Sequence, residues 1–200
     1  EIWVGSFYYR DGNLYDRGGN IHVAESAFEQ KALESLNTLY GTRQGFEMMN
    51  PLMGTNEVNV YIKEASKSEW DDVIASGETG KNIGGTIYWN SHGTKLPTTD
   101  GWKTNATTDL GHEFSHAFDD LVGFDYIAGE YSGAQTSEWR AVYRENLIRE
   151  ELGLPYRTHY AIKKETINPF PLIQEWQPAG PRMLDNDDKP YFPKKYLKEK

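Results

Sequence analysis

The sequence predicts an α+β fold in which a small mixed sheet is accompanied by helices. Two observations lead to this class. Short segments of alternating or mostly apolar residues, separated by turn-forming residues, occupy much of the chain before residue 91. Two longer segments, 106–122 and 137–152, instead show the helical period of apolar residues. An aromatic content of 14% beside 19 glycines fits such a fold and excludes disorder for most of the chain.

The first 23 residues are expected to form short strands. Segments 2–9, 14–15 and 21–23 are rich in β-branched and aromatic residues. Turn-forming sequences at 11–13 and 18–20 separate these segments, which predicts strands connected by tight turns.

Two helices are expected next. Residues 24–40 have helical spacing, and Gly41 ends the segment. A second, short helix is expected from about Thr42 to a point before Pro51, because a residue that precedes proline avoids the α region. The first helix is expected to bury one stripe, formed by Phe28, Ala32, Leu36, Leu39 and Tyr40.

The middle of the chain predicts two strands, a short helix and a loop. Val58, Val60 and Ile62 alternate with polar residues, which predicts a strand with one face in the core. Residues 68–75 are expected to form a short helix. Residues 83–90 are expected to form a second strand near a sheet edge, because its glycines weaken it. Residues 91–105 are predicted to be a loop.

A boundary is predicted after residue 165. The body, residues 1–165, contains the N-terminal strands and the two long helices, which a glycine-rich segment at 123–133 separates. The tail, residues 166–200, is predicted to lack regular structure and to wrap over the body; a linker or interaction tail is the alternative. The tail contains six of the nine prolines: Pro169, Pro171, Pro178, Pro181, Pro190 and Pro193.

Composition excludes several classes of protein. The 200 residues contain no cysteine, so disulfide frameworks, thiolate nucleophiles and cysteine-bound metals are excluded. A net charge of −9 without a basic run argues against nucleic acid as a partner. No apolar segment is long enough for a membrane span, and no signal peptide is recognised. Since the chain opens with Glu1 rather than Met, we expect a processed or excised domain.

One segment carries recognisable chemistry: His112-Glu113-Phe114-Ser115-His116. On a helix, a rotation of ~100° per residue places His116 only ~40° from His112, so both imidazoles leave the same face. Two imidazoles with a carboxylate beside an open position suit zinc. The alternative is a surface helix with two solvated histidines. A separate apolar stripe on the same helix, Leu110, Phe114, Phe118 and Leu121, favours the zinc interpretation.

A third ligand is required, and the chain offers no cysteine or suitably spaced histidine for it. A carboxylate on a following helix remains, as in the gluzincin class of zinc peptidases. Asp119 lies on the histidine-bearing face of the same helix and suits hydrogen bonding to a histidine nitrogen. The downstream candidates are Asp119, Asp120, Asp125, Glu130, Glu138 and Glu145.

Glu138 is the best placed of these carboxylates. Thr136 or Ser137 is expected to cap the helix, which puts Glu138 in its first turn. Glu145 returns to within ~20° of the same face. One of the two glutamates can therefore bind metal while the other hydrogen-bonds a ligand or water, and spacing does not decide between them.

Two further residues follow the glutamate helix at short range. Arg157 and Tyr160 could supply a guanidinium and a phenol hydroxyl to a substrate carbonyl, the donors that a tetrahedral oxyanion requires. Their spacing alone is common, so only their position after the helix gives the pair weight.

Together these motifs resemble the NleD-like effector metallopeptidases. These are zinc proteases of bacterial secretion systems, which also occur as C-terminal toxin domains of Rhs-type polymorphic toxins. The resemblance covers roughly residues 20–160 and is specific in the last fifty of them. Its motifs are GHEFSHA at 111–117, EWRAV at 138–142, EN-x-IR at 145–149 and ELGLP-x-R-x-x-Y at 151–160.

The resemblance implies a zincin-like domain of the gluzincin type. His112, His116 and Glu138 would bind zinc, and Glu113 would act as the base. Arg157 and Tyr160 also resemble the Arg-x-x-Tyr pair of clostridial neurotoxin light chains.

The expected function is a zinc-dependent endopeptidase, secreted or translocated into a target cell, where it would cleave a protein. A substrate strand would pair with residues 83–89. The partners would be a protein or peptide substrate and a cognate immunity protein. The alternatives are a binding protein with a vestigial or structural metal site, and an interaction module whose histidines are incidental.

Overall fold

The computed structural model describes residues 1–53, 58–74, 82–122 and 129–193. The chain divides into two compact units. Unit 1 contains Glu1–Thr94 and Asn105–Phe124, and unit 2 contains Lys95–Thr104 and Asp125–Lys200. The boundary predicted after residue 165 falls inside a strand of unit 2.

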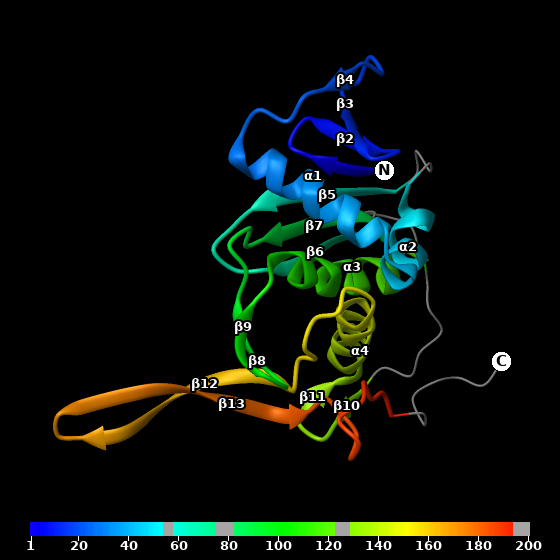
Figure 1. The fold of residues 1–200 in the computed structure, drawn as a ribbon. Helices are drawn as coiled ribbons and strands as arrows, with labels where there is room; N and C mark the ends of the chain where they lie inside the picture. The colour runs from blue at the N-terminus through cyan, green and yellow to red at the C-terminus, as the bar shows by residue number, and fades with distance from the viewer. Residues whose placement is uncertain (54–57, 75–81, 123–128, 194–200) are drawn as a thin grey trace. The chain divides into compact units, whose positions relative to one another are not determined.

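Unit 1 is built on a mixed sheet of seven strands (Figure 1). The central strands β1, β5 and β7 are parallel, and the other pairs are antiparallel. This agrees with the predicted α+β class and mixed sheet. In spatial order the strands are β4 (Ile21–His22), β3 (Asn13–Tyr15), β2 (Phe7–Arg10), β1 (Ile2–Val4), β5 (Asn59–Glu64), β7 (Asn82–Trp89) and β6 (Glu69–Ile74).

The N-terminal strands agree with the prediction except that segment 2–9 is two strands. A turn that contains Gly5, with φ of 61°, separates β1 from β2. Glycine adopts this left-handed conformation without the steric cost that a Cβ would add. The turn lets β2 fold back antiparallel to β1.

Three α-helices and a 3-10 turn belong to unit 1. They are α1 (Ala27–Tyr40), α2 (Arg43–Met49), η1 (Asn50–Leu52) and α3 (Ala106–Val122). Helix α1 begins with a capping box between Ser26 and Glu29, and Gly41 is its C-cap, as predicted. Thr42 caps α2, which confirms the short helix before Pro51.

The helices cover one face of the sheet. Trp89 of β7 donates a hydrogen bond from Nε1 to the Ala106 carbonyl of α3 and packs against Phe28 of α1. Tyr9 of β2 bonds Asn37 of α1 through its hydroxyl. Eight side chains on this inner face are at most 2% exposed; they are Ile2, Val4, Tyr9, Leu14, Val60, Ile62, Ile87 and Trp89.

The helix predicted at 68–75 is wrong. Residues 69–74 form β6, which pairs antiparallel with β7. The Trp70 ring packs at Gly85, where an added Cβ would lie 2.4 Å from the Trp70 ring. Pairing with the next strand along the chain thus decides a segment whose own pattern is ambiguous.

The 83–90 strand is confirmed, but it is not the edge of the sheet. β7 lies between β5 and β6 and pairs with both. Within the described part of the chain, β6 is the strand at this edge. The prediction that a substrate pairs with residues 83–89 therefore fails, because the hydrogen-bonding groups of β7 are used within the sheet.

Unit 2 contains the second long helix, α4 (Thr136–Glu151), as predicted. The predicted loop at 91–105 instead contains a hairpin of β8 (Lys95–Thr98) and β9 (Gly101–Thr104). Two short strands, β10 (Glu130–Tyr131) and β11 (Ala134–Gln135), precede α4. A small core surrounds Trp139 of α4; its other buried members are Ala134, Val142, Met183 and Phe192.

The prediction of an irregular tail is wrong for residues 166–182. β12 (His159–Pro169) and β13 (Leu172–Arg182) form a long antiparallel hairpin (Figure 1). A two-stranded hairpin has two edges, so proline can occupy positions whose amide would not join the ladder. Residues 194–200, the end of the predicted tail, lie outside the described residues.

Among the helices described, none is long and apolar enough to cross a membrane.

Candidate functional site

Helix α3 carries the His-Glu-x-x-His motif. The two imidazoles converge, with 3.3 Å between His112 Nε2 and His116 Nε2. Zinc–nitrogen bonds of about 2.1 Å at a tetrahedral angle would separate two nitrogen ligands by about 3.4 Å. The pair therefore has the spacing that two ligands of a single zinc ion require, and Glu113 lies beside it in the same helical turn.

The interior of unit 1 fixes the position of this helix. Leu110 and Phe114, from the predicted apolar stripe, are fully buried. Asp109 accepts a hydrogen bond from the Thr94 amide at 2.6 Å. His112 and Glu113 are themselves only 8% and 6% exposed, so the motif does not lie on a solvated surface helix.

The acidic residues at the end of α3 are also held in place. Asp119 is 4% exposed and remains one helical turn from His116. Asp120 Oδ2 accepts a hydrogen bond of 2.7 Å from Trp70 Nε1, which ties α3 to β6. Burial raises the pKa of Asp120, and the nearby Asp72 carboxylate raises it further.

Glu138 lies in the first turn of α4, as predicted, although the cap is Gln135 rather than Thr136 or Ser137. His112 and His116 belong to unit 1, and Glu138 to unit 2. Within unit 2, burial raises the pKa of Tyr160, the Glu138 carboxylate raises it further, and the Arg157 guanidinium opposes both. The charges of Glu138 and Arg157 therefore both act on the Tyr160 hydroxyl.

Glu145, the other glutamate of the predicted pair, is fully buried in an ion-pair network. Its Oε1 accepts a hydrogen bond of 2.8 Å from Arg149 Nε, and its Oε2 accepts one of 2.8 Å from Arg157 Nη1. Both carboxylate oxygens are thus bound to guanidinium groups.

Arg157 uses its guanidinium within the protein. Besides the bond to Glu145, Nε donates to the His159 carbonyl at 3.1 Å and Nη2 donates to the Tyr160 carbonyl at 2.5 Å. Arg157 and Tyr160 are therefore in contact, and the contact joins the guanidinium to the tyrosine backbone. Arg157 is 8% exposed, which suits a residue that orders this segment.

Two residues that sequence reasoning missed complete this network. Asn146 is fully buried and bonds the Arg157 backbone twice, at 2.7 Å through Oδ1 and at 3.0 Å through Nδ2. Arg149 is 1% exposed and pairs with Glu145 one helical turn away. Both residues belong to the EN-x-IR motif at 145–149, and the i, i+4 spacing of Glu145 and Arg149 was visible in the sequence, but nothing there assigned either of them a role.

The remaining candidate ligands are Glu130 and Asp125. Glu130 is exposed in β10, and Asp125 lies outside the described residues.

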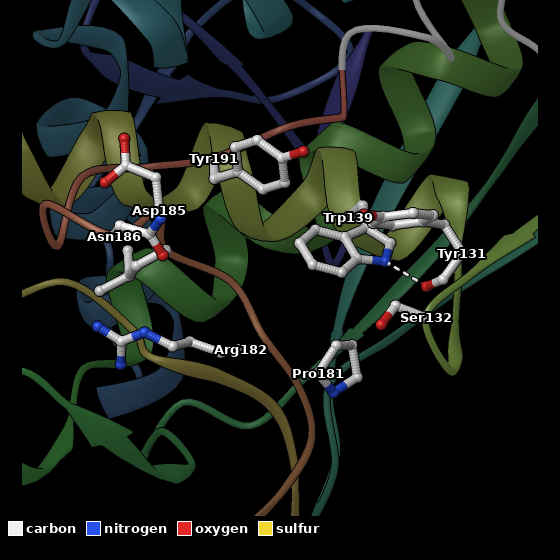
Figure 2. Close-up of a pocket in the computed structure, with 9 residues that line it drawn as sticks. Tyr131, Ser132, Trp139, Pro181, Arg182, Asp185, Asn186 and Tyr191 are labelled. Carbon is white, nitrogen blue, oxygen red and sulfur yellow. Dashed lines mark hydrogen bonds between the residues drawn. The ribbon is translucent and has the colours of Figure 1, made fainter.

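A pocket of about 430 Å³ also lies in unit 2. In Figure 2, Tyr131 and Trp139 lie on one side of it, with Arg182, Asp185 and Asn186 on the other. Trp139 donates a hydrogen bond from Nε1 to the Tyr131 carbonyl at 2.8 Å. The predicted catalytic and metal-binding residues do not line this pocket.

Comparison with known proteins gives one match. The model of the family Peptidase M91, described as an effector protein, matches residues 17–140. The match covers more than half of the chain and includes α3 and the start of α4. No curated protein and no solved structure matches the sequence. The chain therefore belongs to the NleD-like effector peptidase family, Peptidase M91.

Proposed function

We propose that this protein is a zinc-dependent endopeptidase in which His112 and His116 bind the metal and Glu113 is the catalytic base. The observation that carries the proposal is the 3.3 Å separation of the two imidazole nitrogens on α3. Helix geometry alone would bring the two rings to one face, but it would not require their Nε2 atoms to converge. Membership of a peptidase family supports the same reaction class.

Glu138 is proposed as the third ligand. Because the chain has no cysteine, the ligand must come from a histidine or a carboxylate. Glu145 is a poor candidate, since both its oxygens accept hydrogen bonds from buried arginines. Asp120 is engaged by the Trp70 indole. These contacts favour Glu138, whose position after the motif matches the gluzincin pattern.

Glu113 and Tyr160 would each have a part in peptide hydrolysis. When bound, zinc would polarise the substrate carbonyl and make water more acidic. Glu113 would take the proton from the attacking water and later deliver it to the leaving amine. The Tyr160 hydroxyl would donate a hydrogen bond to the oxyanion. Burial and Glu138 raise the Tyr160 pKa, which keeps this donor protonated at physiological pH.

Arg157 is proposed to position Tyr160 rather than to contact the substrate. Its guanidinium nitrogens contact Glu145 and two backbone carbonyls, one of them that of Tyr160. Asp119 is proposed to orient one of the histidines from the same helix.

An extended substrate is proposed to pair with β6 instead of β7. β6 is at the edge of the sheet, so one side of its backbone can accept an additional strand. Its link to α3 through Trp70 and Asp120 connects this edge to the helix that carries the motif.

The substrate is proposed to be a protein of a target cell, into which this effector is secreted or translocated. A cognate immunity protein would protect the producing cell. The family's description as effector proteins supports delivery of this kind.

The test compares wild-type protein with a Glu113→Gln variant in target cells. We expect new protein N-termini with wild type only, and equal zinc content in both purified proteins. The proposal fails if the native protein holds no zinc, or if the Glu113→Gln variant produces the same new N-termini. A stable, zinc-bound wild type that produces none would instead support a binding protein with a structural metal.

A further inference from the structure

Helix α4 begins without a side-chain cap. Its N-cap residue is Gln135, whose side chain makes no capping hydrogen bond. The first amides of a helix have no acceptor within the helix, so a side-chain cap usually fixes this turn. Glu138, the proposed third zinc ligand, lies in this turn. Because a metal ligand has to be held close to its productive geometry, another contact must fix the start of α4.

This contact comes from Trp139, the residue after Glu138. Its Nε1 donates a hydrogen bond of 2.8 Å to the Tyr131 carbonyl in β10 (Figure 2). The indole is 3% exposed, and an indole N–H can only donate, so a buried one needs such an acceptor. Its ring centroid lies 5.4 Å from that of Tyr131 and 6.0 Å from that of Tyr191, whose ring is nearly perpendicular to it. The hydrogen bond and the two rings together fix the orientation of the indole.

The acceptor is itself held by a tight hairpin. β10 and β11 pair antiparallel, and the two residues that join them, Ser132 and Gly133, have φ of 53° and 86°. Positive φ at both positions is typical of the type I′ turn, whose twist matches that of the paired strands. The Thr136 amide then donates to the Gly129 carbonyl at 2.8 Å, which ties this segment to the first residue of α4. The Tyr131 carbonyl is therefore held in place beside the first turn of the helix.

We propose that Trp139 is a positioning residue that holds the Glu138 carboxylate in place for zinc. The inference rests on the proposed function, in which Glu138 completes the ligand set. In this role Trp139 acts through Glu138, by fixing the turn that carries it.

Helix geometry links the two residues. Consecutive helical side chains are ~100° apart, so a rotation of the first turn that moves the Glu138 carboxylate also moves the indole of Trp139. That movement would separate Nε1 from the Tyr131 carbonyl inside the core and leave buried polar groups unpaired, which is unfavourable. The indole therefore resists both rotation and fraying of the turn that carries the ligand.

A residue that only fills the core would behave differently. Trp139 packs with Val142, Met183 and Phe192, so its replacement should destabilise unit 2 in either case. A purely structural residue would change the stability and leave the zinc affinity of the folded protein unaltered. A positioning residue changes both.

The experiment measures zinc affinity by competition with a chromogenic chelator, and stability by urea denaturation, on the full chain. Trp139→Phe keeps an aromatic ring in the core but removes the Nε1 donor. We expect its zinc dissociation constant to rise by about tenfold or more, as for other residues that orient metal ligands. Trp3→Phe is the control, because it also removes an indole hydrogen bond, to Asn59 Oδ1 in unit 1. It should leave the dissociation constant unchanged.

A second variant displaces the acceptor and leaves the core intact. Gly133 has φ of 86°, and an added Cβ would meet no atom within 4 Å, so Gly133→Val strains only the turn. We expect it to weaken zinc binding as well. Gly19→Val is the matched control, since Gly19 has φ of 82° and equally open surroundings in unit 1. It should bind zinc as wild type does.

A double-mutant cycle with Glu138→Gln separates positioning from a general effect on the protein. Trp139→Phe should weaken zinc binding in the wild-type background, and change it by less than about twofold in the Glu138→Gln background. The inference is overturned if Trp139→Phe binds zinc as tightly as wild type, or weakens binding equally in both backgrounds. If Trp139→Phe does not unfold cooperatively in urea, the same comparison is made with Gly133→Val.

Failure of the proposed function has a different signature. Wild type without zinc, or a Glu138→Gln variant with unaltered zinc affinity, would remove Glu138 from the ligand set before Trp139 is changed. A variant Glu138→Gln that loses affinity, beside a Trp139→Phe that does not, would overturn the positioning role alone.

Discussion

Glu145 and Arg157 form an ion pair in the interior of unit 2, with 2.8 Å between Oε2 and Nη1. The carboxylate is fully buried, and the guanidinium side chain is 10% exposed. Arg149 binds the other oxygen, so one carboxylate pairs with two guanidinium groups. Arg157 also binds the Tyr160 carbonyl, so the position of the segment that carries Tyr160 depends on the Glu145 carboxylate.

Replacement of Glu145 by glutamine should therefore be costly. Glu145→Gln preserves the side-chain shape but removes the carboxylate charge that two buried guanidinium groups contact, which should lower the free energy of unfolding by about 3 kcal/mol or more. Urea denaturation measures the change. Glu47→Gln, which breaks the exposed pair with Arg43, is the control and should cost less than about 1 kcal/mol. Equal losses in the two variants would contradict a special role for Glu145.

Glu138→Gln should weaken zinc binding without unfolding the protein. Loss of an anionic ligand from a three-ligand site should lower the zinc affinity by at least about tenfold, since second-shell changes alone cost that much. Competition with a chromogenic chelator measures the affinity. Glu151→Gln, at the exposed end of the same helix, should leave the affinity unchanged. Unaltered affinity in the Glu138 variant would remove this residue from the ligand set.

Gly180 is expected to set the position of the Tyr160 ring. It has φ of 70°, and a Cβ there would lie 3.2 Å from Tyr160 Cδ1 and 3.3 Å from Tyr160 Cβ. It sits where the β12–β13 register shifts, and such irregularities redirect side chains. Gly180→Ala should lower kcat by displacing the ring, besides a backbone cost of about 1 kcal/mol.

Gly153 provides the matched control for Gly180. Its φ is 66°, but an added Cβ would meet no atom within 4 Å. Gly153→Ala should have the same backbone cost and leave kcat unchanged. If both variants lose activity in proportion to their stability, Gly180 has no positioning role.

His159 should make the protein less stable in acid. Burial lowers the pKa of His159, and Arg182 lowers it further. Because the unfolded chain then binds the proton more tightly, this contribution to stability is fully present above about pH 6.5 and is lost as the pH falls toward the folded-state pKa. Thermal melts from pH 8 to pH 5 should show a smaller decline for His159→Gln than for wild type. The exposed His92→Gln is the control, and identical declines in all three proteins would refute the prediction.

Local sequence patterns were sufficient to predict α3 and α4. α3 and α4 agree with the predicted 106–122 and 137–152 to within one residue, because apolar spacing and capping are local signals. The same helical period places His112 and His116 on one face of α3, although it does not by itself require their Nε2 atoms to converge.

Strands whose own pattern is ambiguous were harder to predict, because pairing with the neighbouring strand decides them. Residues 69–74 form a strand because β7 pairs with them, and the 166–182 segment forms a hairpin although prolines suggested irregular structure. The role of Glu145 was equally hard to predict from the sequence. Its contact with Arg157 requires the chain to reverse after α4, where Gly153 adopts φ of 66°, and no periodicity encodes that reversal.

The essential contacts of unit 2 join residues close in the sequence, whereas those of unit 1 join distant ones. This difference affects the order in which the two units can fold. The pairs that Glu145 makes with Arg149 and Arg157 lie within a short contiguous segment, so a refolding chain can close them quickly. The central sheet instead needs Ile2 beside Val60, and Ile62 beside Ile87. Such non-local pairing is intrinsically slow, so any chain that reaches its destination unfolded would recover the Glu145 ion pairs of unit 2 long before the sheet of unit 1.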